Sequence, residues 1–180
     1  AELMDWAWAQ MDAGYFNTIG ASNWTTARMA EATELARTLG RPAFVGSQVG
    51  WSLMESRQDG IADNSLVHMD ANEFAGYLSS RLPVFAYQAQ ARGFFKRQSE
   101  THLKRYDTPL NHARLQKVDE ISHRTGWTQN QIALAWFWQQ PFPAIPVIGA
   151  RTRDQLQDSL AAMAIELDPS DWGQLTHPLP

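Results

Sequence analysis

The stretch from Thr128 to Leu160 reads TQNQIALAWFWQQPFPAIPVIGARTRDQLQDSL, and it decides the fold class. Its first part is apolar nearly all round, which predicts a buried helix over residues 129–140, ended by two prolines. A short apolar run over residues 144–148 predicts a strand, and a second helix begins after Thr152. A helix, a strand and a helix in direct succession are typical of α/β proteins with parallel strands.

The same alternation runs through the rest of the chain. Thr128 with Gln131, and Thr152 with Gln155, each form a capping-box pattern in which two side chains bond each other's backbone N–H. Apolar runs predict strands, and helical periodicity with Gly and Pro stop signals predicts the helices between them. The expected strands cover residues 15–19, 43–46, 84–87 and 144–148, and a turn is expected over residues 20–23. The expected helices cover residues 2–12, 25–39, 71–80, 111–125, 129–140 and 152–164, with a last one from Asp168.

One helix followed by four strand–helix units predicts half of an eight-stranded (βα)8 barrel of the TIM type, in a single domain over residues 1–180. A small doubly wound sheet is the alternative fold. No Gly-x-Gly-x-x-Gly motif follows any of the expected strands, which argues against a dinucleotide site of the doubly wound kind.

Composition excludes several classes of protein. The chain has 180 residues, of which 44% are hydrophobic and 19% charged, as in globular domains. Its formal net charge of -4 argues against non-specific nucleic-acid binding. No apolar run reaches the ~18 residues of a membrane span, so no membrane partner and a cytoplasmic location are expected. Cysteine is absent, which removes disulfides and thiol nucleophiles.

The five histidines show no metal-ligand spacing, so no metal site is expected. Asp63, His68 and Asp70 lie close together in the sequence, but a solvated loop over residues 51–70 explains them better than a ligand set does. No Ser-His-Asp arrangement is supported either.

Polar side chains follow each expected strand, at the end where a barrel binds its ligands. Ser22 and Asn23 follow the first strand and Gln48 the second, and their side chains can hydrogen-bond an amide. Tyr87 ends the third strand and can stack on a planar ring, while Arg92 beyond it can meet a phosphate. Each residue also has an ordinary structural explanation as a helix start, a polar loop, a packed rim or a solvated charge.

The segment Gly149-Ala150-Arg151-Thr152 has the strongest physical argument for a ligand. It runs into a capped helix, whose first N–H groups are free and carry partial positive charge. Gly149 and Ala150 let a ligand approach the backbone, and Arg151 adds a donor pair suited to phosphate. A capped surface helix with an exposed arginine is the alternative.

Taken together, these stretches resemble the aldo-keto reductase family in order and spacing. The matching stretches are residues 20–24 (GASNW), 48–53 (QVGWSL), 86–95 (AYQAQARGFF), 128–136 (TQNQIALAW), 148–152 (IGART) and 155–160 (QLQDSL). The resemblance covers nearly the whole chain and implies the carboxy-terminal, cofactor-binding half of that family's barrel. The implied activity is NADP-dependent reduction of an aldehyde or ketone, or oxidation of an alcohol, by hydride transfer.

The resemblance also implies roles for single residues. Ser22, Asn23 and Gln48 would hold the nicotinamide carboxamide, Tyr87 would stack on the ring, and Gln88, Ala89 and Gln90 would line the pyrophosphate path, with Arg92 counted among the cofactor-binding residues. Gly149, Ala150 and Arg151 would face the adenosine 2′-phosphate, with Gln155, Asp158 and Ser159 near the adenine. Trp24, Trp51 and Met54 would form part of the substrate wall. The sequence departs from the family pattern at Ser47, Trp51, Asp158 and Ser159, where members often have Asn, Tyr, Glu and Asn.

The family's catalytic Asp, Tyr, Lys and His lie on its first four strand–helix units, and no residue here matches them. The chain alone is therefore expected to be inactive. Its expected partners are a small carbonyl substrate and either a missing amino-terminal half or a second copy of the chain, paired through exposed sheet edges. It begins with Ala1 rather than Met, and the expectation is that it is cut from a longer protein. A non-catalytic nucleotide-binding or regulatory module, and an inactive truncated fragment, are the alternatives.

Overall fold

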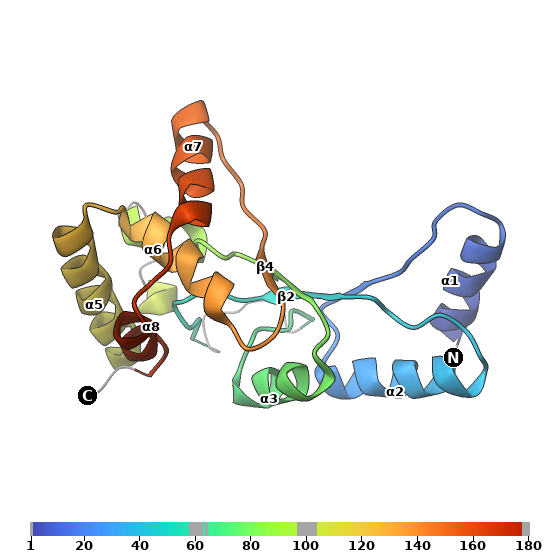
Figure 1. The fold of residues 1–180 in the computed structure, drawn as a ribbon. Coiled ribbons are helices and arrows are strands. Elements are labelled where there is room, and N and C mark those ends of the chain that lie inside the picture. The colour runs from blue at the N-terminus through green and yellow to red at the C-terminus, as the bar shows by residue number, and fades with distance from the viewer. Residues whose placement is uncertain (1, 58–62, 64, 97–103, 178–180) are drawn as a thin grey trace.

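The computed structural model describes residues 2–57, 63, 65–96 and 104–177. Its centre is a four-stranded parallel sheet in the order β1-β2-β3-β4, with helices around it (Figure 1). The strands are β1 (Ala21–Ser22), β2 (Ser47–Gly50), β3 (Val84–Tyr87) and β4 (Ala144–Pro146). The helices are α1 (Glu2–Asp12), α2 (Thr26–Thr38), α3 (Ala71–Ser80), α5 (Pro109–Thr125), α6 (Gln129–Ala135), α7 (Arg153–Ala161) and α8 (Pro169–Thr176). Short 3₁₀ turns are η2 (Ala91–Lys96), η3 (Trp136–Gln139) and η4 (Ala162–Ala164).

The predicted α/β class with parallel strands is confirmed, but two strands lie later than expected. The expected strands over 15–19 and 43–46 precede β1 and β2 in the chain. Pairing of β1 with β2 begins at Ala21 and Ser47, and before it the Val45 N–H donates to the Ile19 carbonyl at 2.9 Å. The expected turn over 20–23 therefore contains β1 instead. The prediction placed each strand on its apolar run, whereas the hydrogen-bonded pairing of β1 and β2 lies on the more polar residues that follow each run.

Helices with strong local signals lie where the sequence places them. α3 and β3 have the expected bounds, and Asp168 caps α8 ahead of Pro169. Helix α6 begins with a complete capping box but ends at Ala135, where η3 replaces the last part of the expected helix. The second expected box is half formed. Thr152 accepts from the Gln155 N–H, but the Gln155 side chain accepts from the Arg151 N–H instead.

The sheet has one buried and one exposed face. Val84 and Ala86 of β3 are fully buried, whereas Phe85 between them is 40% exposed. Ile145, which is in register with Phe85, is also 40% exposed, so the exposed side is partly apolar. A doubly wound sheet covers both faces with helices, and the described helices cover one. This one-sided burial argues against the doubly wound alternative.

Two apolar cores hold the layers together. The larger one lies among β2, β3, α3, α5, α6 and α8, and its aromatic centre is Trp51 with Phe137 and Phe142. The smaller one packs α1 and α2 against β1, through Met4, Trp8, Met29 and Phe44. In Figure 1, α1 and α2 lie to the right of the strands, and α5, α6 and α8 lie to the left. None of the helices in the described part is both long and apolar enough to cross a membrane.

Candidate functional site

Four of the predicted site residues meet at the carboxyl ends of three neighbouring strands. Ser22 is in register with Gln48, and Gly50 of β2 is in register with Tyr87. The Asn23 N–H donates to the Gln48 carbonyl at 2.9 Å, which extends the β1–β2 ladder by one residue. Residues from three separate segments therefore lie at one edge of the sheet, the edge at which parallel α/β folds bind ligands.

The Asn23 side chain is the junction of this group. Its Oδ1 accepts from the Tyr87 hydroxyl at 2.7 Å and from the Val67 N–H at 3.1 Å. Its Nδ2 donates to Ser22 Oγ at 3.3 Å, so the amide keeps a further N–H for a ligand. Asn23 has a φ of 57°, in the left-handed region that asparagine tolerates better than most residues. The amide oxygen of Asn23 is thus occupied by hydrogen bonds within the protein, whereas one N–H of its Nδ2 is available to a ligand.

Tyr87 and Gln48 complete the group. The Tyr87 ring is half-buried, and burial raises the pKa of its hydroxyl, so the group is a neutral donor to Asn23. The Gln48 side chain is partly buried and has no hydrogen-bond partner among the described residues. An amide with both its donor and acceptor free can match another amide, because each group offers what the other lacks.

The loop after β3 leaves the sheet through an unusual backbone. Gln88, Ala91 and Arg92 have φ values of 60°, 48° and 53°, all in the left-handed region. In the orientation that satisfies both groups, the Gln88 amide oxygen accepts from Arg92 Nη2 at 2.8 Å and Nε at 3.2 Å. Ala89 is fully buried, so only its backbone can face a ligand. The exposed Arg92 is the charged group of this loop.

Two residues with predicted adenine roles belong to a polar network between α6 and α7. Gln90 Nε2 donates to Asn130 Oδ1 and to Ser159 Oγ, each at 2.9 Å. Asp158 accepts from Asn130 Nδ2 at 2.9 Å and from Thr128 Oγ1 at 2.8 Å. Ser159 is 5% exposed, so its side chain mainly joins these elements. The network ties the second half of α7 to the start of α6 and to the loop after β3.

The predicted phosphate end lies at the start of α7. Arg151 is exposed, and its guanidinium has no partner among the described residues. A Cβ placed on Gly149 would meet no atom within 4 Å, so the space beside this backbone is open. A cavity of about 460 Å³ lies next to it, between the first turns of α6 and α7, with Phe95, Asn130 and Gln155 in its lining.

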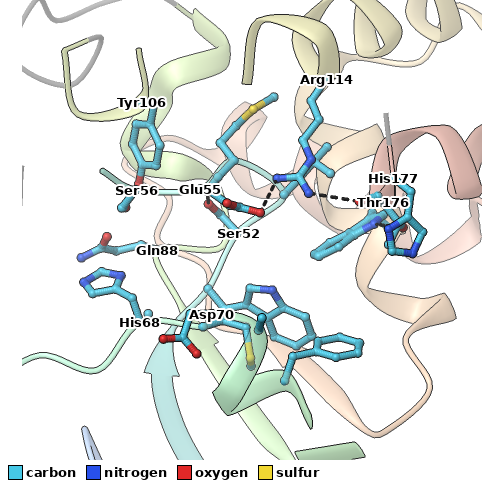
Figure 2. Close-up of a pocket in the computed structure, with 18 residues that line it drawn as sticks. Ser52, Glu55, Ser56, His68, Asp70, Gln88, Tyr106, Arg114, Thr176 and His177 are labelled. Atoms are coloured by element: carbon cyan, nitrogen blue, oxygen red, sulfur yellow. Dashed lines mark hydrogen bonds and ion pairs between the residues drawn. The ribbon is translucent and has the colours of Figure 1, made fainter. Parts of the chain in front are cut away.

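The predicted substrate residues are only partly brought together. Trp51 and Met54 are 7% and 1% exposed, and both line a cavity of about 520 Å³ (Figure 2). Trp51 is also part of the larger core, where it packs edge-on against Trp136. Trp24 lies elsewhere, with its ring edge against Phe44 and Arg28 stacked above it at 3.7 Å.

Sequence reasoning missed several residues of this region. His68 is half-buried beside Gly50 and Tyr87, so its interpretation as part of a solvated loop was wrong. Asp70 is exposed, as that interpretation expected, and its side chain caps α3. Arg105 lies beside His68, and Arg114 is buried at the far side of the larger cavity. The long-range contacts of these residues leave no periodic signal in the sequence. Within the described residues, no group of three or more His, Cys, Asp or Glu side chains could hold a metal ion.

Comparison with known proteins gives consistent matches. The model of the Aldo/keto reductase family matches residues 9–178. The uncharacterized oxidoreductase YrpG of Bacillus subtilis is 28% identical over 166 residues, covering 88% of this chain and 48% of the relative. Protein tas of Escherichia coli is 30% identical over 162 residues, covering 86% of this chain and 45% of the relative.

A similar fold occurs in a solved structure, that of a thermostable aldo-keto reductase in complex with the inhibitor epalrestat. The TM-score is 0.60 at 22% identity, and the match covers 92% of this chain and 49% of the other. This chain thus spans about half the length of the proteins that it matches.

Proposed function

The chain belongs to the aldo/keto reductase family, and on that premise we propose that it is the cofactor-binding half of an NADP-dependent oxidoreductase. The substrate would be an aldehyde or ketone, or an alcohol in the reverse direction. The observation that carries this proposal is the meeting of Asn23, Gln48 and Tyr87 at adjoining strand ends. A planar ring bearing an amide suits two side-chain amides and an aromatic face.

The donor set of the site fits a nicotinamide dinucleotide phosphate. Asn23 would donate to the carboxamide oxygen, because its own oxygen already accepts two hydrogen bonds. Gln48 would accept from the carboxamide nitrogen, and Tyr87 would lie against the ring. Arg151 would bind the 2′-phosphate through a guanidinium that has no partner in the described part of the chain. Once bound, the nicotinamide would supply the hydride for carbonyl reduction.

A complementary half would complete both the barrel and the catalytic group. The exposed, partly apolar sheet face needs a cover, and β1 and β4 are free to pair at the two outer edges of the described sheet. Carbonyl reduction also needs an acid within hydrogen-bond reach of the carbonyl oxygen. Tyr87 does not suit this role, because its hydroxyl donates to Asn23 and its pKa is raised. We therefore place the acid on the complementary half.

A nucleotide-binding module without turnover is the second candidate. It is favoured by one observation: the described residues provide free donors for a dinucleotide but no group that we can assign as the acid. An inactive fragment would show neither nucleotide binding nor turnover. Binding and turnover therefore separate the three cases.

The test is to purify the chain, alone and joined to an amino-terminal half from a relative, and to titrate each with NADPH. We expect NADPH binding in both forms and NADPH consumption with aldehydes only in the joined form. Binding without consumption in the joined form would favour the module. The absence of NADPH binding from both forms would contradict the proposed function.

A further inference from the structure

A short segment after the long loop brings His68 to the edge of the candidate site. The Gly50 N–H donates to the Val67 carbonyl at 2.9 Å, and the Met69 N–H donates to the Gly50 carbonyl at 2.8 Å. The His68 ring lies where a side chain on Gly50 would be, since a Cβ there would come within 2.4 Å of Nδ1. Its ring centroid is 6.1 Å from that of Tyr87. The absent side chain of Gly50 therefore makes room for the imidazole beside Tyr87.

Arg105 is fixed next to this histidine by three contacts. Its Nη2 lies 3.4 Å from His68 Nε2, and its Nε donates to Ser56 Oγ at 3.2 Å. Its carbonyl accepts from the Arg57 N–H at 2.9 Å, which ties its backbone to the loop after β2. A guanidinium held at both its head and its backbone is oriented before any ligand arrives, which lowers the entropy cost of binding.

The charge around Arg105 is not balanced by the described residues. Burial, Arg105 and Arg92 all lower the pKa of His68, so the imidazole is neutral near pH 7 and its Nε2 can accept from Arg105. No described carboxylate forms an ion pair with Arg92 or Arg105. Asp63 is the acidic group whose charge acts on Tyr87, and its Oδ1 already accepts from Ser65. A partly buried cation with no counter-ion in the described part of the chain would be stabilised by an external anion.

Open space adjoins two residues that Arg105 contacts, Ser56 and His68. The cavity of about 520 Å³ has Ser56, His68 and Gln88 in its lining, and these three lie on one side of it in Figure 2. Arg114 on the far side already donates to Glu55 and to two carbonyls at the end of α8. Arg105 contacts two of the lining residues, Ser56 and His68, so an anion at that side of the cavity would lie next to its guanidinium.

We propose that Arg105 binds an oxyanion, a phosphate or a carboxylate, beside Tyr87, with His68 as the positioning residue. The ligand could come from two sources. One is a phosphate of the dinucleotide in the proposed function, and the other is an acidic group on the carbonyl substrate. The location beside the ring rests on the proposed function, whereas oxyanion binding itself does not.

Calorimetric titration of the 180-residue chain with inorganic pyrophosphate and with benzoate tests the two sources separately. Arg105→Gln should weaken binding of at least one probe about tenfold, the loss expected for one charge-assisted hydrogen bond. Lys104→Gln is the matched control, because it removes the same charge from the neighbouring exposed position and should change neither affinity. Circular dichroism checks that both variants remain folded.

The outcomes separate the possibilities. Loss for pyrophosphate alone assigns the site to a cofactor phosphate, and loss for benzoate alone assigns it to an acidic substrate. An NMR titration should also show the pKa of the His68 imidazole rising when the anion binds, because the anion offsets the field of the two arginines. If the wild-type chain binds neither probe, or if Arg105→Gln binds both as the wild type does, the inference is overturned. If NADPH fails to bind while Arg105-dependent oxyanion binding persists, only the proposed function fails.

Discussion

The Tyr87 hydroxyl donates to Asn23 Oδ1 at 2.7 Å, across 64 residues of sequence. The bond joins the end of β3 to the residue after β1 and passes over β2 between them. It orients the tyrosine ring and consumes an acceptor of the amide. The ring face and the amide donor of the candidate site are therefore set by one interaction.

Tyr87→Ala should weaken NADPH binding by about 1 kcal/mol, because the aromatic contact with the nicotinamide is lost. Tyr87→Phe keeps the ring and removes only the bond to Asn23, so its loss should be clearly smaller. Quenching of tryptophan fluorescence during NADPH titration measures both affinities. Equal losses in the two variants would show that the hydroxyl, and not the ring, matters for binding.

Arg151→Ala should weaken NADPH binding by about 1–3 kcal/mol, the range for a hydrogen bond between charged groups. NADH binding should change little, because NADH lacks the 2′-phosphate. Arg153→Ala is the control, since Arg153 is likewise exposed at the start of α7. The same loss for NADPH and NADH would refute the assignment of Arg151 to the 2′-phosphate.

Arg114→Met should lower the free energy of unfolding by about 2 kcal/mol, because one buried and one partly buried carbonyl of α8 lose their donor. Arg114 is 6% exposed and donates to the carbonyls of Leu175 and Thr176 as well as to Glu55. Glu55→Gln should cost less than about 1 kcal/mol, since the Glu55 side chain is 57% exposed and its ion pair is screened by water. Urea unfolding of the two variants and the wild type gives the comparison, and a neutral Arg114→Met would contradict it.

The stability of the chain should depend on pH through His68. Its pKa in the folded protein is lowered from the ordinary value of 6.5, first by burial and then by Arg105 and Arg92. The unfolded chain then binds the proton more tightly, so this contribution is complete above about pH 6.5 and is lost as the pH falls through the folded pKa. Urea unfolding at several pH values between about 8 and 5 should therefore show a steeper loss for the wild type than for His68→Gln. If the unfolding free energies of the wild type and of His68→Gln change in parallel with pH, the pKa of His68 is the same in the folded and unfolded chains, which contradicts the prediction.

The isolated chain should self-associate and should not reduce carbonyls. Apolar side chains are exposed on the free sheet face and on both flanking helices, and such surfaces favour association. They are Phe85, Ile145 and Val147 on the sheet, Leu156 and Leu160 on α7, and Leu3 and Trp6 on α1. Analytical ultracentrifugation with an NADPH-consumption assay tests both statements, and an added complementary half should reduce the association. A monomeric chain that consumes NADPH with an aldehyde would overturn the half-barrel proposal.

The sequence predicted those features that depend on local signals. Helix α3, strand β3 and the capping box at Thr128 lie as expected, because each is specified by residues within a few positions of one another. The ladder positions of β1 and β2 were misplaced, since pairing depends on a partner segment far along the chain. Only one of the two hydrogen bonds of the second capping box forms. The Gln155 side chain accepts from the Arg151 N–H and not from the Thr152 N–H.

The candidate site divides in the same way. Strand ends carrying Asn23, Gln48 and Tyr87 could be located from their order along the chain. The positions of His68 and Arg105 could not, because they depend on the space above Gly50 and on contacts 37 residues apart. A missing side chain that admits another residue is a three-dimensional feature without a periodic pattern.

The spatial order of the strands is also their order of synthesis. A chain emerging from the ribosome can add each new strand to an edge that already exists, without threading between earlier ones. Ser22, Asn23 and Gln48 are then in place before Tyr87 arrives, and Arg151 comes last. The end of the site proposed to hold the ring would thus be assembled during translation before the end proposed to hold the 2′-phosphate.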